Sequence, residues 1–198
     1  MSKYMRNKFI FYGIKTPLRK KIIKKYLDEI NFLSNKEVES VIRLLWNEKH
    51  RELHYLALDL IDIIKQNNKE IIFLVEWMIT RNSWWDSIDP IATKILGFYF
   101  NKYPDKIKSI TNKWMNTKNI WLQRCCILFQ LKYKDKTNTD LLESLILKSS
   151  NSKEFFIQKS IGWSLREYAK TNPEWVLSFV ESNFLMPLSK REALKYLK

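Results

Sequence analysis

The chain has 198 residues, of which 45% are hydrophobic and only three are glycine. This length can bury one sizeable core, so we expect a single domain over residues 1–198. Lysine and arginine number 35 against 21 acidic residues, which gives a net charge of +14. Such a charge favours a polyanionic partner, either nucleic acid or an anionic membrane.

The sequence argues against a membrane protein and against a secreted one. Its apolar runs are shorter than the roughly 18 residues that a membrane-spanning helix needs. The N-terminus has no continuous apolar segment of the kind found in secretory signals, so we expect a cytoplasmic protein. Cys125 and Cys126 are adjacent in an apolar stretch, where they cannot form loop-closing disulfides. We expect them to be reduced thiols in the core.

Helix boundaries recur along the whole chain and separate segments of roughly 11 to 18 residues with helical apolar spacing. Thr16 before Pro17 and Asn172 before Pro173 each suit a helix N-cap followed by proline in the first turn. The boundaries in chain order are Thr16-Pro17, Ser34-Asn35, Asn67-Asn68, Ser83, Tyr103-Pro104, 116–119, Thr137-Asn138, 149–152, Asn172-Pro173 and 187–189.

Helices of similar length joined by short polar turns, without a strand signal, predict an all-α fold. The expected architecture is a set of antiparallel helix pairs stacked as a HEAT-like α-solenoid with a basic concave face. Self-similarity between the segments is weak. A compact helical bundle therefore remains the alternative.

His50 and His54 have the four-residue spacing of a helical metal pair, but the residues between them are Arg-Glu-Leu. A zinc peptidase helix needs glutamate directly after its first histidine, and the sequence offers no evident third ligand. Glycine-rich phosphate loops and nucleophile elbows are also missing from the sequence. We therefore expect neither a bound metal nor a cofactor.

Residues 81–90 concentrate two indoles and two carboxylates beside a helix start. Trp85 and Asp89 are four residues apart, so one helical turn would project both in the same direction. This segment is the best candidate for a reactive site. The structural alternative is a capping role, in which Asp89 precedes Pro90 as an N-cap and Ser83 with Asp86 forms a capping box.

Two further segments depart from simple amphipathicity. Residues 120–131 are apolar nearly all round and predict a central helix, but they contain Arg124. A buried guanidinium needs a partner, so Arg124 either meets a carboxylate or enters a groove that an anion fills.

In residues 153–170 the apolar side chains share one face of a helix. Lys159, Trp163, Arg166 and Lys170 follow the same spacing on another face. That face is either an ordinary solvated surface or a nucleic-acid-binding surface with cations for phosphates and an indole for a sugar or base.

Several segments together resemble the AlkD-type family of alkylpurine DNA glycosylases. They are residues 4–8, 13–17, 83–89, 119–124, 153–159, 162–163, 165–168 and 188–193. The resemblance runs through nearly the whole chain. It implies a HEAT-like solenoid that holds duplex DNA and hydrolyses the N-glycosidic bond of cationic N3- or N7-alkylated purines.

The resemblance also implies roles for individual residues. Asp89 matches the catalytic carboxylate, Trp85 and Trp163 match indoles that contact the lesion's deoxyribose, and Arg124 matches a basic residue near the DNA backbone. The remaining expected DNA-binding residues are Lys159, Arg166, Lys170, Lys190 and Arg191.

In two respects the sequence departs from the family. Pro90 follows the carboxylate where an ordinary residue is usual, and the chain begins where relatives have already completed an N-terminal helix that helps to enclose DNA. It also stops early at the C-terminus. The rival functions are a non-catalytic DNA-binding relative with an incomplete clamp and a protein-interaction solenoid, which would not explain the charge. A monomer is expected.

Overall fold

The computed structural model of the chain describes residues 1–64 and 68–197. These residues form helices, turns and one isolated β-bridge between Ile10 and His50. The all-α prediction is therefore confirmed. Of the expected boundary Asn67-Asn68, the first residue lies outside the described part of the chain. No helix in the described residues is long and apolar enough to cross a membrane.

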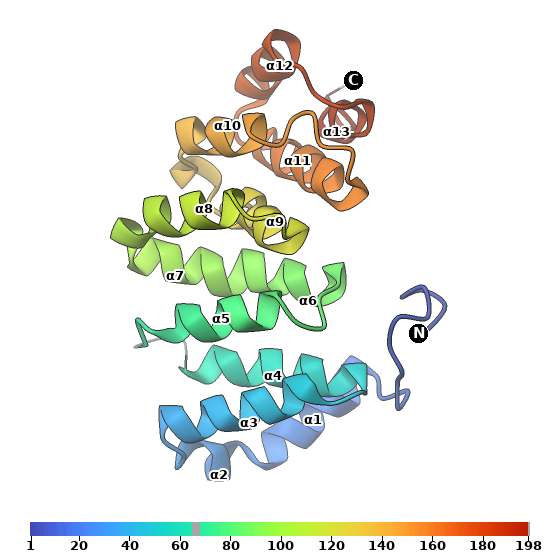
Figure 1. Cartoon of the computed structure of the whole chain (residues 1–198), viewed down its shortest axis with the longest axis vertical. Coiled ribbons are helices and arrows are strands. Elements are labelled where there is room, and N and C mark those ends of the chain that lie inside the picture. Colours follow the sequence, from blue (N-terminus) through green and yellow to red (C-terminus); the bar gives the residue numbers. More distant parts are fainter. Residues whose placement is uncertain (65–67, 198) are drawn as a thin grey trace. The chain divides into compact units, whose positions relative to one another are not determined.

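Internal contacts divide the chain into two units, residues 1–82 and 83–198. In the first unit, residues 1–64 and 68–82 form five helices in chain order: α1 (Thr16–Lys25), α2 (Leu27–Asn31), α3 (Asn35–Asn47), α4 (Arg51–Ile64) and α5 (Ile71–Ile79). Figure 1 shows α3 and α4 as neighbouring layers of this unit. The expectation of a single domain stays a prediction.

Two helix starts in the first unit show how local sequence sets the boundaries. Ser34 caps α3, since its hydroxyl accepts the Glu37 N–H while the Glu37 carboxylate accepts the Ser34 N–H at 2.7 Å. The cap predicted at Thr16 is wrong. Lys15 is the N-cap of α1 without a side-chain bond, and Thr16 is already helical. With Pro17 fixing the backbone of the first turn, the helix can begin without a capping oxygen.

One buried carboxylate binds the loop that precedes α1. Glu52, at the start of α4 and only 2% exposed, accepts the backbone N–H groups of Tyr12, Gly13 and Ile14 at 2.8 to 3.1 Å. Gly13 has a φ of +89°, which L side chains rarely adopt, so the loop around Glu52 depends on glycine there. We call these contacts the Glu52 anchor.

The second unit contains the remaining helical elements. They are α6 (Trp85–Pro90), a π-helical turn (Ile91–Leu96), α7 (Gly97–Lys102), α8 (Ile107–Met115), α9 (Ile120–Leu128), α10 (Thr139–Leu147), α11 (Phe155–Tyr168), α12 (Pro173–Ser182) and α13 (Pro187–Ala193), with short 3-10 turns at Pro104–Lys106 and Lys134–Lys136. Asn172 caps α12 by accepting the Trp175 N–H, as its sequence predicts.

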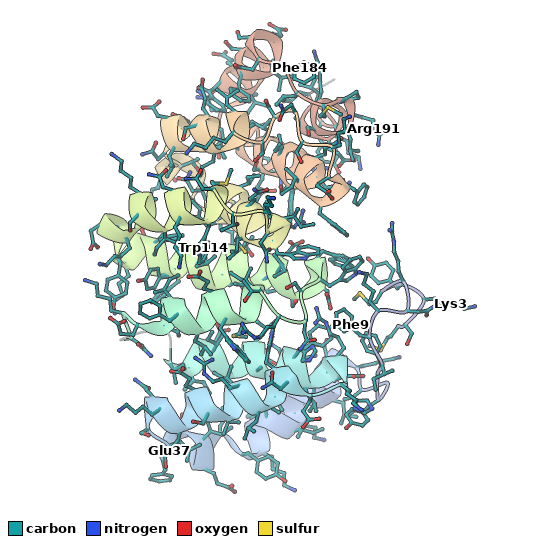
Figure 2. The ribbon with its side chains drawn as sticks, in the orientation of Figure 1. Lys3, Phe9, Glu37, Trp114, Phe184 and Arg191 are labelled. Carbon is teal, nitrogen blue, oxygen red and sulfur yellow. The ribbon has the colours of Figure 1, made fainter. Side chains whose placement is uncertain are left out.

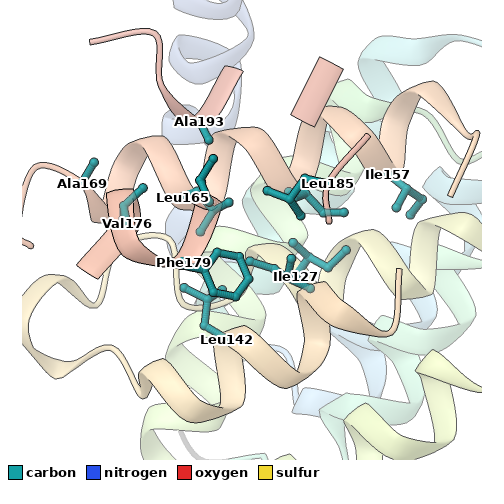
Figure 3. Packing of buried hydrophobic residues seen from close by; sticks show 12 residues of the cluster. Ile127, Leu142, Ile157, Leu165, Ala169, Val176, Phe179, Leu185 and Ala193 are labelled. Atoms are coloured by element: carbon teal, nitrogen blue, oxygen red, sulfur yellow. The ribbon is translucent and has the colours of Figure 1, made fainter. Parts of the chain in front are cut away.

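Helix α9 lies at the centre of this unit, where it contacts α6, α8, α10, α11 and the π-helical turn. Its position confirms the prediction from its all-round apolar sequence, and Cys125 and Cys126 are free thiols in its buried part. Figure 3 shows the neighbouring core, in which Ile127 of α9 and Leu165 of α11 pack with Phe179 of α12. Burial of these apolar faces fixes α9 and α11 against each other.

Candidate active site

Helix α6 places Asp89 inside a continuous helical stretch. The helix begins at Trp85 with Trp84 as its N-cap, and after Pro90 it continues directly into the π-helical turn. The backbone carbonyl of Asp89 accepts the Thr93 hydroxyl at 2.8 Å. Asp89 is therefore not a helix N-cap. The capping alternative for this residue is wrong because the helix starts four residues earlier.

The carboxylate of Asp89 forms a two-pronged ion pair with Arg124 of α9. Nε of Arg124 donates to Oδ1 at 2.7 Å, and Nη2 donates to Oδ2 at 2.9 Å. The side chain of Arg124 is 5% exposed and that of Asp89 is 16% exposed. Of the two alternatives for Arg124, the carboxylate partner is confirmed. Paired N–H donors of a planar guanidinium fix both the position and the plane of the carboxylate.

Arg124 is itself held by α11, because its Nη1 donates to the backbone carbonyl of Phe156. Aromatic rings surround this contact. Trp84, Trp121 and Phe156 form a triangle with ring centroids 4.9 to 5.7 Å apart. These rings come from the start of α6, from α9 and from α11. They give the guanidinium an apolar setting, which strengthens its attraction to the carboxylate.

Burial raises the pKa of the Asp89 carboxyl above its ordinary value. The hydrogen bonds and the charge of Arg124 act in the opposite direction, and nearby Asp86 adds to the increase. A buried carboxyl with one cationic partner is a common feature of reactive sites, because its protonation responds to whatever charge comes near.

Trp85 lies on α6 with Asp89, and Trp163 lies on α11, whose Phe156 carbonyl holds Arg124. Trp85 is half-buried and precedes Asp89 by one helical turn, so the two side chains share one face of α6. Trp163 is half-buried on α11, seven residues after Phe156 and about 10 Å along the helix. Among the described residues, no hydrogen bond or ring contact joins Trp163 to Asp89 or Arg124.

Phe156 begins a stripe along α11 that also includes Lys159, Trp163 and Arg166, all within about 80° of the helix circumference at 100° per residue. We call these four residues the α11 stripe. Lys170, which was predicted to continue it, lies in the turn after the helix ends at Tyr168. The stripe starts at the carbonyl that holds Arg124 and carries two of the three cations predicted from the helix pattern. The apolar residues Ile157, Ile161 and Leu165 are fully buried on the other face, as predicted.

The predicted DNA-binding cations differ in what they contact. Lys159 and Arg166 both pair with Glu192 of α13, at 3.0 and 2.7 Å, and exposed Lys170 pairs with Glu167 at 2.7 Å. Lys190 and Arg191 are exposed on α13, where Figure 2 labels Arg191. Their contact with DNA stays a prediction, as does that of the deeply buried Arg124.

No group of three or more histidine, cysteine, aspartate or glutamate side chains in the described residues could hold a metal ion. The two histidines with metal-pair spacing have other contacts. His54 bonds through Nδ1 to Arg51 and through Nε2 to the Glu48 carbonyl, while His50 stacks on Tyr12 with centroids 3.6 Å apart.

Sequence reasoning missed two parts of this region: the carbonyl of Phe156 that holds Arg124, and Glu192. A backbone acceptor leaves no signal in a side-chain pattern. Glu192 stands in a Lys-Arg-Glu run at the surface of a short helix, which is typical of a solvated face. One signal could have identified Glu192: Lys159, Arg166 and Glu192 all lie in segments that carry the family resemblance.

Comparisons with known proteins agree on one family. Residues 1–197 match the family described as DNA alkylation repair enzyme. A solved structure described as a predicted DNA alkylation repair enzyme from Enterococcus faecalis is similar to this chain with a TM-score of 0.91 and 35% sequence identity, over 100% of this chain and 92% of that one. A comparison with curated protein sequences gives no significant match.

Proposed function

Because the chain belongs to the DNA alkylation repair enzyme family, we propose that it hydrolyses the N-glycosidic bond of cationic N3- or N7-alkylated purines in duplex DNA. Family membership supports the DNA repair role, and the glycosylase chemistry is the proposal. The observation that carries it is the Asp89 carboxylate, held in a fixed plane by Arg124 while its side chain keeps 16% of its surface exposed.

The substrate's charge decides which catalytic groups are needed. A purine alkylated at N3 or N7 is already positive, so it accepts the electron pair of the breaking bond and leaves as a neutral base. No general acid is required. The candidate site has a carboxylate on the same helix face as an indole, and its arginine donates two hydrogen bonds to that carboxylate. This arrangement suits a reaction that needs an anion and no proton donor.

As the bond to C1′ breaks, the deoxyribose acquires oxocarbenium character, as in other glycoside hydrolyses. Asp89 stabilises this positive charge electrostatically, and the indole of Trp85 on the same helix face adds its electron-rich ring. A carboxylate has about four lone-pair positions, and Arg124 uses two of them. The remaining positions can orient a water whose oxygen attacks C1′ and whose proton passes to the carboxylate or to solvent.

Arg124 has a positioning role in this scheme. Its positive charge offsets part of the charge on Asp89, so its benefit comes from geometry. A carboxylate that is fixed before the substrate arrives needs no reorganisation as charge develops on the sugar. Trp163 would contact the sugar or its neighbour from α11, and the exposed cations of α11 and α13 would contact phosphates.

The decisive experiment is release of 7-methylguanine from a methylated duplex, measured under single-turnover conditions for the native chain and for Asp89→Asn. We expect the native chain to release the base and the variant to lose at least about 100-fold in rate. Binding of undamaged duplex should change little, because the lost charge acts mainly on the transition state.

The outcomes separate the two rival functions. Equal release by the native chain and Asp89→Asn would remove Asp89 from the chemistry. Tight duplex binding without release by either protein would establish the non-catalytic DNA-binding alternative. Thermal unfolding of the variant is the necessary control, since Arg124 loses its anionic partner when Asp89 is replaced.

A further inference from the structure

Glu192 of α13 lies between two cations of the α11 stripe. Its Oε1 is 3.0 Å from Nζ of Lys159, and its Oε2 accepts a hydrogen bond from Nη1 of Arg166 at 2.7 Å. The two cations are seven residues apart on α11, with Trp163 between them in sequence. One acidic side chain therefore bridges two helical turns of the surface that carries the candidate DNA contacts.

The backbone beneath Glu192 holds this residue in place. A Cβ atom added to Gly162 would lie 2.4 Å from the Cβ of Glu192 and 2.9 Å from the carbonyl oxygen of Ser189. The Ser189 hydroxyl also donates to the Gln158 carbonyl of α11 at 3.1 Å. Only a glycine allows α13 to approach α11 so closely, and the approach delivers the Glu192 carboxylate to the edge of the stripe.

The electrostatics show a carboxylate that is ionised and cations with donors to spare. Burial raises the pKa of Glu192, but the hydrogen bonds and charges of Lys159 and Arg166 outweigh this and hold the pKa below its ordinary value. Lys159 has three N–H donors and Arg166 has five. Among the described residues, Glu192 is the only hydrogen-bonding or ion-pairing partner of either side chain.

The three side chains differ in how their charged groups are attached. Glu192 has its Cβ against α11, whereas Lys159 and Arg166 carry their charges at the ends of longer side chains that can turn toward an incoming anion. Their side chains are 37% and 21% exposed. A carboxylate and a phosphate offer the same kind of paired oxygen acceptors to guanidinium and ammonium groups.

We propose that Glu192 is a built-in competitor of the DNA backbone: it pairs with Lys159 and Arg166 in the free protein, and a duplex phosphate must take these cations from it. The proposal rests on duplex DNA being the ligand, as in the proposed function. The competition lowers affinity for every duplex, and most visibly for undamaged DNA, which offers no lesion contacts in return. Glu192 thereby sets a limit on non-specific binding.

The test is the affinity of the whole chain for an undamaged duplex, measured over a range of salt concentrations for Glu192→Gln. The matched control is Glu181→Gln, which removes the same charge from an exposed site on α12. We expect Glu192→Gln to tighten binding about fivefold at 0.1 M salt, since partly exposed ion pairs hold back on the order of 1 kcal/mol. The salt slope should steepen, because the native protein must break two ion pairs as the phosphate contacts form, and Glu192→Gln has none to break. Glu181→Gln should change affinity by less than about twofold.

A Glu192→Gln variant that binds no more tightly than Glu181→Gln would overturn the proposal and make Glu192 a residue that orients the cations for DNA. Absence of duplex binding in both the native chain and Glu192→Gln would overturn it as well. If Gln at 192 disturbs folding, Glu192→Ala is the second variant, because alanine keeps the Cβ that faces Gly162.

The readout is independent of base excision. Tighter binding by Glu192→Gln in a protein that releases no methylated base would leave this inference standing while the proposed chemistry fails. Normal excision without tighter binding would do the reverse.

Discussion

Each unit of the chain buries a carboxylate, and the two are satisfied in different ways. Glu52 accepts three backbone N–H groups from one loop and is 2% exposed. Asp89 accepts two N–H groups from a single side chain and keeps 16% of its side chain exposed. A loop that wraps a carboxylate encloses it, whereas a guanidinium fork covers one edge and leaves the other accessible.

Arg51 precedes Glu52 in the sequence, and Arg124 pairs with Asp89 in the structure. Arg51, fully buried, donates to the Asn82 carbonyl at 2.7 Å and lies 3.9 Å from the ring centroid of Phe9. Arg124 directs two of its donors to a carboxylate. We infer that the Glu52 anchor serves folding of the first unit, and that the Asp89–Arg124 pair keeps a charged group ready for a ligand. The following predictions test that difference.

The largest effect is expected for Arg124→Leu, which leaves Asp89 without a cationic partner in a mostly buried position. Breaking such a pair costs about 3 to 5 kcal/mol of unfolding free energy, and the carboxyl then retains its proton to higher pH. Denaturant unfolding and base excision at neutral pH should both show the loss. Arg124→Lys restores the charge without the fork, so it should recover more stability than excision rate. Full recovery of both by lysine would contradict the positioning role.

Glu52→Gln should cost about 2 to 3 kcal/mol, because an amide presents one acceptor and one donor group to three N–H donors. Urea unfolding measures the loss, and limited proteolysis should show faster cleavage near residues 1–15. In single-turnover assays with saturating protein, the folded variant should excise within about threefold of the native rate, since Glu52 has no part in the chemistry. A much larger loss of rate at unchanged stability would contradict the assignment of Glu52 to folding.

Smaller effects are expected for Trp85→Ala and Trp163→Ala. An aromatic face contributes on the order of 0.5 to 2 kcal/mol to a nearby cation, so each variant should slow excision by about 2- to 30-fold. Rates equal to that of the native chain in both variants would exclude sugar contact by these indoles. Trp114→Phe is a control, because Trp114 is 1% exposed in the core and should affect stability alone.

The smallest effect concerns pH. In the proposed chemistry, excision requires ionised Asp89, whose pKa is raised in the folded chain by burial. The rate should therefore fall on acidification at a higher pH than an ordinary aspartate, near 3.9, would give. Stability should depend on pH in the opposite direction. Because the pKa of Asp89 is higher in the folded chain than in the unfolded chain, its protonated form contributes stability below the unfolded pKa. This contribution is lost as the pH rises through the folded pKa. A pH–rate profile and unfolding of Asp89→Asn at several pH values measure both.

Sequence alone predicted the helices and the central place of α9, because apolar periodicity is a local signal. The catalytic role of Asp89 follows from the family resemblance and stays a prediction. It left two partners open for Arg124, since the choice depends on the distance between α6 and α9, 35 residues apart along the chain. The capping role considered for Asp89 was wrong because the residues before Pro90 do not show that the helix continues through this proline. The structure has Pro90 inside α6, followed directly by the π-helical turn.

Glu192 marks the limit of pattern reading. Its partners lie 33 and 26 residues away on another helix, and their meeting depends on the absence of a side chain at Gly162. A glycine adds neither an apolar nor a charged side chain to a sequence pattern. Its role in a close approach between helices can be recognised only when the position of the neighbouring helix is known.

The π-helical turn after Asp89 has a consequence for insertions and deletions in this part of the chain. Gly97 donates its N–H to the carbonyl of Ala92, five residues back, so Ile91–Leu96 accommodates one more residue per hydrogen-bonded turn than an α-helix does. The extra residue lies between α6, which carries the candidate site, and α7, whose Tyr99 and Phe100 are buried. Deleting a single residue between 91 and 96 would restore ordinary α-helical pitch and leave the Trp85–Asp89 face in nearly the same direction relative to α7, because the π-helical turn holds one residue more for the same rotation. Ile91–Leu96 is therefore the part of this continuous helix that can lose one residue without turning the candidate site away from its present direction.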